Sequence, residues 1–308
     1  MDGETRMKNK VVIIGCGNVG MSYAYALLNQ KTKVTDVVLV DIDEERVLGE
    51  VMDLNHGLPF APSKIRFKAG TYYDCMDASI VVICAGAPQK KGETRLDLIY
   101  KNEKIMKDVV AKVLETNFNG VFLVVSNPVD VMTYVVQKYS KFPYGKVIGT
   151  GTTLDTARLR FIIGNHLKIN PKNVHAYVLG EHGDSEFVAW SNAFIGSSGI
   201  ERYLLVDELE MFEKEVKDAA YNIIERKNAT YYGVAMAMVR ITNAILNDEN
   251  TILTVSSYNE EHDIYIGMPS IVNRRGVVGK LKIELTNEEK EKFNKSVEVI
   301  KGAISKLK

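Results

Sequence analysis

The sequence predicts an α/β protein in which a doubly wound parallel sheet occupies the first half and an α+β region follows. Three observations predict this class. Short runs of β-branched residues alternate with longer helical patterns up to about residue 165. Each run is almost continuously apolar, as parallel strands covered by helices on both faces require. With 308 residues the chain also exceeds the usual size of one compact core, which favours two lobes.

The repeated order of strand, helix and strand indicates right-handed βαβ units. The expected strands are residues 11–15, 37–41, 79–86, 121–128 and 146–151. The expected helices are about 18–30, 43–56, 95–116, 129–139 and 153–167. We place one domain at residues 1–150 and a second at 151–308, where the pattern shifts without a flexible linker.

The second half has a different pattern. NVHAYVLGEHG, residues 173–183, reads as one further strand, and two long helices are expected at about 206–227 and 231–247. Short alternating segments at 251–257, 261–268 and 276–285 suit antiparallel pairing. The last helix is expected to begin after Thr286, because Glu289 completes a capping box and apolar residues recur behind it at helical spacing.

Composition limits the possible partners and locations. Lys plus Arg number 39 and Asp plus Glu also 39, so nothing in the charge favours nucleic acid or an anionic membrane. A polar N-terminus runs into VVIIG, which is far too short for a signal peptide or a membrane span, so we expect a cytoplasmic protein. The three cysteines have no CxxC spacing, which predicts reduced thiols, no disulfide and no metal site.

A glycine-rich turn, GCGNVG, lies between the first expected strand and the first expected helix. Its first glycine permits a tight turn, its second lets backbone approach a pyrophosphate, and its third allows close helix packing. Asp41 ends the next strand, where an acid accepts bonds from ribose hydroxyls and repels a 2′-phosphate. The pattern therefore predicts a Rossmann domain that binds NAD rather than NADP. The expected contacts are Gly15, Gly17, Asn18, Val19, Gly20, Asp41, Gly86 and Asn127.

Charged and polar residues follow the later strands, at the edge of the sheet where ligands bind. The loop and helix start at 86–98 carry Gln89 and Arg95, and this loop is either a lid or a solvated loop. Asn127 either contacts a ligand or caps the following helix. Asp155 and Arg158 share a helix face, which also suits an ordinary surface ion pair. Locally, His182 in GEHGDS is as compatible with a polar strand end as with an acid/base.

Seven motifs in order resemble the NAD-dependent L-lactate dehydrogenases of the bacterial type, within the lactate and malate dehydrogenase family. They are GCGNVG, DIDEER, CAGAPQKKGETRLDL, SNPVD, GTTLDTARLR, GEHGDS and KNATYYG, and they span nearly the whole chain. Seven ordered motifs are far more specific than the glycine turn alone. Lactate and malate dehydrogenases share this order of motifs, so the motifs do not decide which of the two substrates the protein uses.

The resemblance implies a role for each polar residue in reducing pyruvate to L-lactate. His182 is implied as the acid/base, and Asp155 as the carboxylate that holds it and raises its pKa toward neutrality. Arg158 is implied to clamp the substrate carboxylate. The resemblance implies that Arg95 polarises the ketone. It also implies that Asn127 contacts the substrate and that Thr230 lines the pocket for the substrate side chain.

Gln89 favours pyruvate over oxaloacetate. Malate dehydrogenases resemble one another in having arginine at this place, which neutralises the second carboxylate of oxaloacetate, whereas this chain reads PQKKG. A buried carboxylate facing a neutral glutamine lacks a partner. Lys90 and Lys91 keep malate dehydrogenase open as the nearest alternative. A dehydrogenase of another 2-hydroxy acid also remains open.

Arg160 and His175 resemble the pair that regulated bacterial lactate dehydrogenases use to bind fructose 1,6-bisphosphate. The resemblance places that ligand at a subunit dyad and implies a homotetramer that the ligand activates. The alternative is a surface arginine and an unremarkable strand histidine. A protein of a different class, which senses NAD(H) without chemistry, would keep the glycine turn and Asp41 but has no need of Asp155, Arg158, His182 and Arg95 together.

Overall fold

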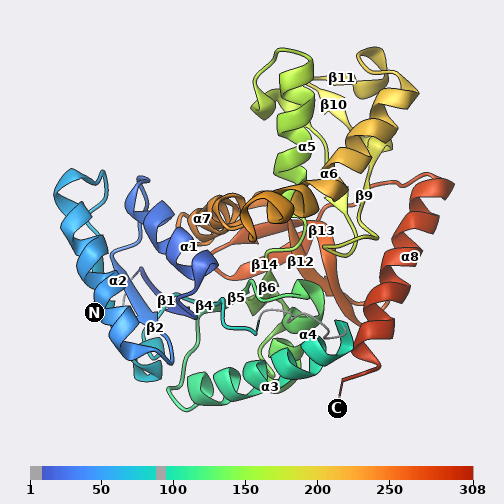
Figure 1. Ribbon diagram of the computed structural model, residues 1–308. Helices are drawn as coiled ribbons and strands as arrows, with labels where there is room; N and C mark the ends of the chain where they lie inside the picture. Colours follow the sequence, from blue (N-terminus) through green and yellow to red (C-terminus); the bar gives the residue numbers. More distant parts are fainter. Residues whose placement is uncertain (1–8, 88–94, 308) are drawn as a thin grey trace, which may run out of the picture.

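The structure is a computed structural model that describes residues 9–87 and 95–307, without the side chains of residues 95–97. Six parallel strands form the first part of its central sheet: β1 (Lys10–Ile14), β2 (Asp36–Val40), β3 (Arg66–Ala69), β4 (Ile80–Ile83), β5 (Val121–Val124) and β6 (Val147–Gly149). Three antiparallel strands extend it: β12 (Thr251–Asn259), β13 (Ile264–Asn273) and β14 (Gly276–Lys280). The order is β14-β13-β12-β6-β5-β4-β1-β2-β3, with a switch point between β4 and β1 (Figure 1).

Helices cover both faces of this sheet. One face packs on α1 (Asn18–Leu28), α2 (Glu44–Gly57) and α7 (Tyr232–Leu246), and the other on α3 (Arg95–Leu114), α4 (Val129–Ser140) and α8 (Asn287–Ile304). In β1, Val11 and Ile13 belong to the first buried cluster, whereas Val12 and Ile14 belong to the second. Because alternate side chains enter opposite buried layers, all four residues from Val11 to Ile14 are apolar.

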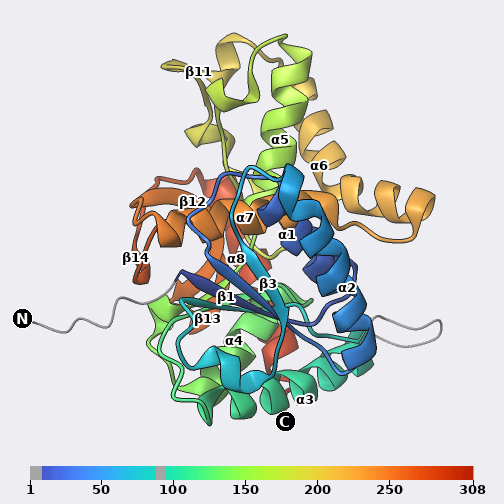
Figure 2. The same ribbon diagram turned by 90° about the vertical axis from the view of Figure 1, so that its left-hand side faces the viewer.

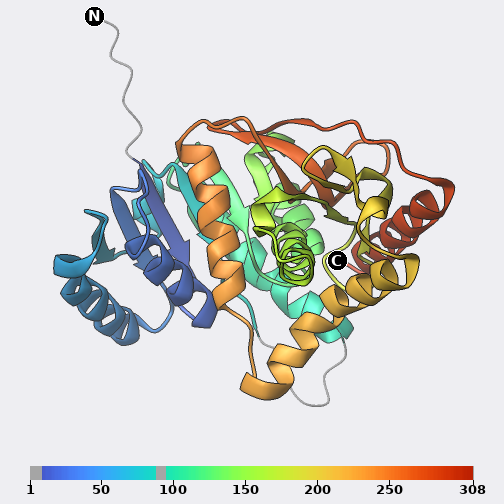
Figure 3. The ribbon, with the colours of Figure 1, turned by 90° about the horizontal axis from the view of Figure 1, so that it is seen from above.

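A smaller region projects from the sheet and its helices (Figure 2). It contains α5 (Thr153–His166), α6 (Val206–Lys227) and a three-stranded sheet of β7 (Val174–His175), β10 (Phe194–Ile195) and β11 (Ser198–Gly199). A two-stranded sheet of β8 (Val178–Leu179) and β9 (Phe187–Val188) lies at its base. Seen from above, α7 lies between α1 and α5, so it joins the two regions (Figure 3).

The predicted fold class is confirmed, and some elements differ from expectation. The strand β3 was not predicted, because RFKA is short and carries two charges. The single strand expected at 173–183 is wrong: β7 pairs with β10 and β8 pairs with β9, so the chain changes sheets at Ala176 and Tyr177. The C-terminal strands pair antiparallel, as expected, and they join the first sheet through Ser256 and Gly149. The domain boundary after residue 150 stays a prediction.

The three cysteines are free thiols, as expected. Burial raises the pKa of Cys16 and Cys75 to about 12, which keeps both protonated near neutral pH. Within the described part of the chain, no helix combines the length and the apolar character needed to cross a membrane.

Candidate active site

The glycine turn follows β1 at the switch point of the sheet. Gly15 has a φ of +99°, and a Cβ there would lie 2.4 Å from the Ala85 nitrogen. A Cβ on Gly20 would lie 2.1 Å from the Gly15 oxygen. Gly17, at the N-cap of α1, has nothing within 4 Å of the same position. The first and third glycines are therefore required by packing, while the second leaves open space at a helix N-terminus, where a pyrophosphate binds.

Asp41 faces this turn from the end of β2. Its carboxylate accepts hydrogen bonds from the Cys16 N–H at 2.6 Å and the Asp43 N–H at 3.2 Å. Gly15, Gly17, Asp41 and Gly86 all line one cleft of about 650 Å³, a usual size for a cofactor site. Asn18 and Val19 form the first turn of α1 beside it. The donors and the space in this cleft fit a dinucleotide.

His182 lies in the turn between β8 and β9 and meets the N-terminal part of α5. Its Nδ1 is 2.7 Å from the Oδ2 of Asp155, and the Asp155 side chain is only 1% exposed. Because Nδ1 donates to the carboxylate, the Nε2 atom is left for a substrate. The His182 side chain is 27% exposed, so part of the imidazole ring is accessible from solvent while the Asp155 carboxylate is buried.

Arg158 completes the group from one turn further along α5. Its guanidinium nitrogen lies 2.6 Å from the other oxygen of Asp155, and the arginine side chain is 13% exposed. Asp155 and Arg158 therefore form a buried ion pair. The sequence alone is also compatible with an ordinary surface ion pair, which these contacts exclude. The Asp155 carboxylate thus binds the acid/base candidate with one oxygen and the arginine with the other.

The electrostatics of the pair follow from these contacts. The negative charge of Asp155, opposed in part by burial, raises the pKa of His182 to about 9. Burial alone would raise the pKa of Asp155, but its contacts with His182, Arg158 and Glu186 hold it below the ordinary value. The imidazole is therefore protonated near neutral pH, beside an ionised carboxylate.

Asp130 is a supporting residue to which the sequence assigned no role. It lies in the first turn of α4, accepts the His182 backbone N–H at 2.9 Å, and accepts the Ser256 hydroxyl from β12. Burial raises its pKa to about 6, against the opposing hydrogen bonds. The SNPVD motif contains this aspartate, but no spacing in the sequence indicates which backbone N–H donates a hydrogen bond to it.

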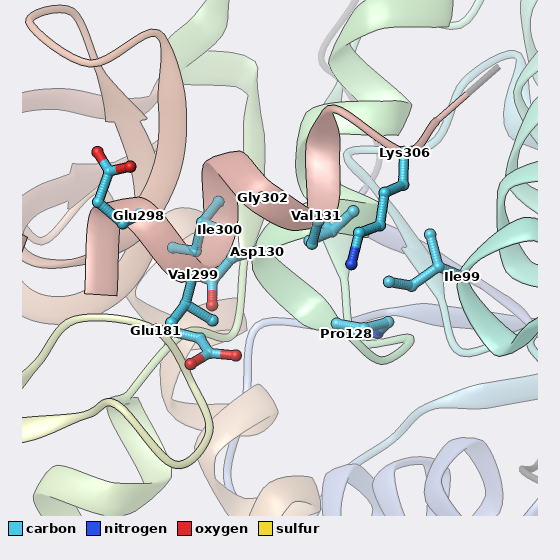
Figure 4. A pocket seen from close by; sticks show the side chains of 11 residues that line it. Ile99, Pro128, Asp130, Val131, Glu181, Glu298, Val299, Ile300, Gly302 and Lys306 are labelled. Carbon is cyan, nitrogen blue, oxygen red and sulfur yellow. The ribbon is translucent and has the colours of Figure 1, made fainter. Parts of the chain in front are cut away.

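The two acids on either side of His182 in the GEHGDS motif have other partners. Glu181 accepts a hydrogen bond from the Ser185 hydroxyl at 2.5 Å, and Asp184 accepts one from Tyr221 at 2.6 Å. Glu181 and Asp130 line a pocket of about 270 Å³ against α8, whose lining includes Lys306 and Ile300 (Figure 4). This pocket lies on the α4 and α8 side of the turn that carries His182.

Two other residues of the expected set lie in described parts of the chain. Asn127 is exposed and precedes a cis bond to Pro128, and its carbonyl accepts a bond from Asn102 at 2.8 Å. Pro128 is the N-cap of α4 and no side chain caps it, so Asn127 is not a helix cap. Thr230 is half-buried in the connection between α6 and α7. Gln89 lies outside the described residues, and so does the side chain of Arg95 at the start of α3.

Arg160 and His175 lie in the projecting region. The Arg160 Nε donates to the Ala176 carbonyl at 3.2 Å, and its guanidinium lies 5.7 Å from the centre of the Tyr177 ring. Burial lowers the pKa of Arg160. His175 is exposed in β7, next to the residue that Arg160 contacts. The two belong to neighbouring elements, which is compatible with one anion site.

Comparison with known proteins identifies the family to which the chain is similar. The family model for the lactate/malate dehydrogenase NAD binding domain matches residues 9–149, and that for the lactate/malate dehydrogenase alpha/beta C-terminal domain matches residues 152–308. L-lactate dehydrogenase 2 of Bacillus anthracis is 50% identical over 307 residues, covering 96% of this chain and 98% of the relative.

Two solved structures are also similar. A lactate dehydrogenase enzyme from a Medee basin deep-sea metagenome library is 49% identical with a TM-score of 0.95, covering 97% of this chain and 99% of that one. The minor L-lactate dehydrogenase from Enterococcus mundtii, in its ligands-bound form, is 42% identical with a TM-score of 0.96, covering 98% and 99%.

The chain belongs to the lactate/malate dehydrogenase family and is an enzyme with NAD as its cofactor. Its relatives at 42–50% identity place it on the NAD-dependent L-lactate dehydrogenase branch of that family.

Proposed function

We propose that this enzyme reduces pyruvate reversibly to L-lactate with NADH, and that His182 is the acid/base. The observation that carries the proposal is the buried contact of His182 and Arg158 with the same Asp155 carboxylate, at 2.7 and 2.6 Å. This group combines a protonated imidazole with a planar cation, which is what the reduction of a 2-oxo acid needs. The relatives named L-lactate dehydrogenase support the same activity.

The residues divide the work as follows. NADH held in the cleft of Gly15, Gly17 and Asp41 would supply the hydride for the ketone carbon. His182 gives its Nε2 proton to the ketone oxygen, and Asp155 at Nδ1 stabilises the imidazolium before this step and orients the ring. Arg158 holds the substrate carboxylate, because a guanidinium binds a carboxylate through two parallel hydrogen bonds. In lactate oxidation the neutral imidazole takes the proton back.

The roles of the remaining residues belong to the same proposal. Arg95 polarises the ketone, Asn127 contacts the substrate and the nicotinamide end, and Thr230 lines the side-chain pocket. Gln89 faces the substrate methyl group, where oxaloacetate would present a second carboxylate. Asp41 accepts bonds from the adenosine ribose.

Steady-state NADH oxidation with pyruvate and with oxaloacetate tests the proposal. We expect a higher kcat/KM with pyruvate. Equal or greater efficiency with oxaloacetate would instead assign a malate dehydrogenase, and preference for a branched 2-oxo acid would assign another 2-hydroxy acid dehydrogenase. The absence of turnover with every 2-oxo acid would favour a protein that only senses NAD(H).

We also propose that Arg160 and His175 bind a phosphate group of fructose 1,6-bisphosphate at a subunit dyad, in a homotetramer that acts in the cytoplasm. The support is that a half-buried arginine and an exposed histidine lie on neighbouring elements. Guanidinium and imidazolium groups are suited to phosphate. Such a ligand activates by favouring the assembly with higher substrate affinity.

A further inference from the structure

A third carboxyl group lies against the His182–Asp155 pair. Glu186 directly precedes β9 and is only 4% exposed. One polar atom of Glu186, one of Asp155 and one of His182 all lie within 4.8 Å of one another. Buried acids are rare in proteins unless they are paired. The mechanism above gives Glu186 no role, so its burial at this place needs an explanation.

The charges around Glu186 show which acid keeps a proton. From α5 it faces Asp155 and Arg158, and from its own turn it faces His182. The negative charge of an ionised Glu186 would raise the pKa of His182 further, as the charge of Asp130 on α4 also does. Asp155 already binds both cations, at 2.6 and 2.7 Å, so it is the acid that stays ionised. Burial and the charge of Asp155 raise the pKa of Glu186 well above its ordinary value.

We propose that Glu186 is a positioning residue that remains protonated and donates a hydrogen bond to the Asp155 carboxylate, so that it limits the negative charge presented to His182. This inference rests on the proposed role of His182 as acid/base. A hydrogen bond between the two carboxyl groups is one of the contacts that lower the pKa of Asp155. Asp155 then receives three donors: the imidazole, the guanidinium and the Glu186 hydroxyl.

This arrangement has a chemical purpose. A buried carboxylate with a single imidazole partner stabilises the imidazolium strongly, and an acid that is too weak transfers its proton slowly. A neutral donor on the opposite side of the carboxylate reduces that stabilisation without adding charge. Glu186 therefore brings the protonation equilibrium of His182 closer to the working pH.

The test is the pH profile of kcat/KM for pyruvate at saturating NADH, measured for the unaltered enzyme, Glu186→Gln and Glu186→Leu. Glutamine has a neutral donor of the same shape, so the apparent pKa should stay unchanged. Leucine has no donor, so the apparent pKa should rise by about half a unit, roughly a threefold change in the ratio of protonated to neutral histidine. Glu213→Gln is the control, because Glu213 is a buried acid on α6 bonded to Trp190 and Lys217.

Two results overturn the inference. If both Glu186 variants lower the apparent pKa, the side chain is ionised and acts by charge. If neither variant moves it, the role of Glu186 is structural only. In either case the unaltered enzyme still reduces pyruvate, whereas failure of that enzyme to do so defeats the proposed function itself.

An infrared measurement gives a second readout should the leucine variant not fold. Near neutral pH, the difference spectrum between the unaltered enzyme and Glu186→Gln should contain the carbonyl stretch of a protonated carboxylic acid. A carboxylate band in its place contradicts the proposal.

Discussion

At the residue scale, burial makes the Asp155 carboxylate a much stronger partner for His182 than the sequence indicates. From the sequence we expect a His182 pKa raised toward neutrality, whereas in the structure the contact with Asp155 raises this pKa to about 9. The difference arises because Asp155 is 1% exposed and in direct contact, so solvent screens the attraction little. The pairing could be inferred from the motif order, but the degree of burial could not.

This pKa predicts the pH dependence of both directions of the reaction. Pyruvate reduction needs protonated His182, so at saturating NADH it should stay level near neutral pH and fall as the pH rises through about 9. Lactate oxidation needs the neutral ring and should rise over the same range. Asp155→Asn removes the main cause of the raised pKa, so both limbs should move to lower pH and kcat should fall roughly 10²–10⁴-fold. If the pH profile of this variant does not shift, a group other than His182 causes the pH dependence.

A second prediction at this scale concerns the choice of substrate. Gln89→Arg supplies a cation for the second carboxylate of oxaloacetate, so the ratio of kcat/KM for oxaloacetate to that for pyruvate should rise by at least about tenfold. Steady-state kinetics with the two substrates measure it. Gln89→Leu, which is neutral and of similar length, is the matched control and should not favour oxaloacetate. If the arginine variant leaves the ratio unchanged, residue 89 does not face the substrate side chain.

At the element scale, local patterns predicted most helices and strands, because both faces of the sheet are covered and the apolar runs are unmistakable. The sequence does not indicate a strand at residues 66–69, because β3 is an edge strand with two exposed charged side chains and no apolar run marks it. The sequence does not indicate the break between β7 and β8, because the two strands pair with different partners, β10 and β9, and no local pattern marks that change. Asp130 and Glu186 were assigned no role for the same reason, since their contacts arise only in the folded chain.

The turn before α1 allows a test of the cofactor site. Gly17→Ala places a methyl group where the protein has nothing within 4 Å, so the variant should keep its melting temperature yet bind NADH at least about tenfold more weakly. Gly20→Ala is the matched variant: its methyl group would lie 2.1 Å from the Gly15 oxygen, so this variant should lose stability. Calorimetry and NADH titration separate the two effects. Unaltered NADH affinity in Gly17→Ala would show that the pyrophosphate does not approach this glycine.

At the scale of the whole molecule, one sheet runs through both halves of the sequence. The hydrogen-bonded contact between β6 and β12 continues the parallel strands into the antiparallel ones, and α7 covers the same face as α1 and α2. The site thereby gathers residues from distant segments, since Asp130 on α4 binds both Ser256 of β12 and the turn of His182. Sequence patterns predict each helix or strand by itself. They do not show that a strand near the C-terminus supports a turn in the middle of the chain.

The projecting region leads to a prediction about assembly. If Arg160 and His175 bind a phosphate, fructose 1,6-bisphosphate should lower the apparent KM for pyruvate by roughly five- to a hundredfold at low enzyme concentration. It should also shift the mass measured by light scattering toward the tetramer, because a ligand that binds one assembly favours it. Arg160→Gln together with His175→Gln should abolish both effects, while Arg226→Gln, an arginine on α6 with 72% exposure, should retain them. Equal responses from these variants would leave Arg160 and His175 as structural residues.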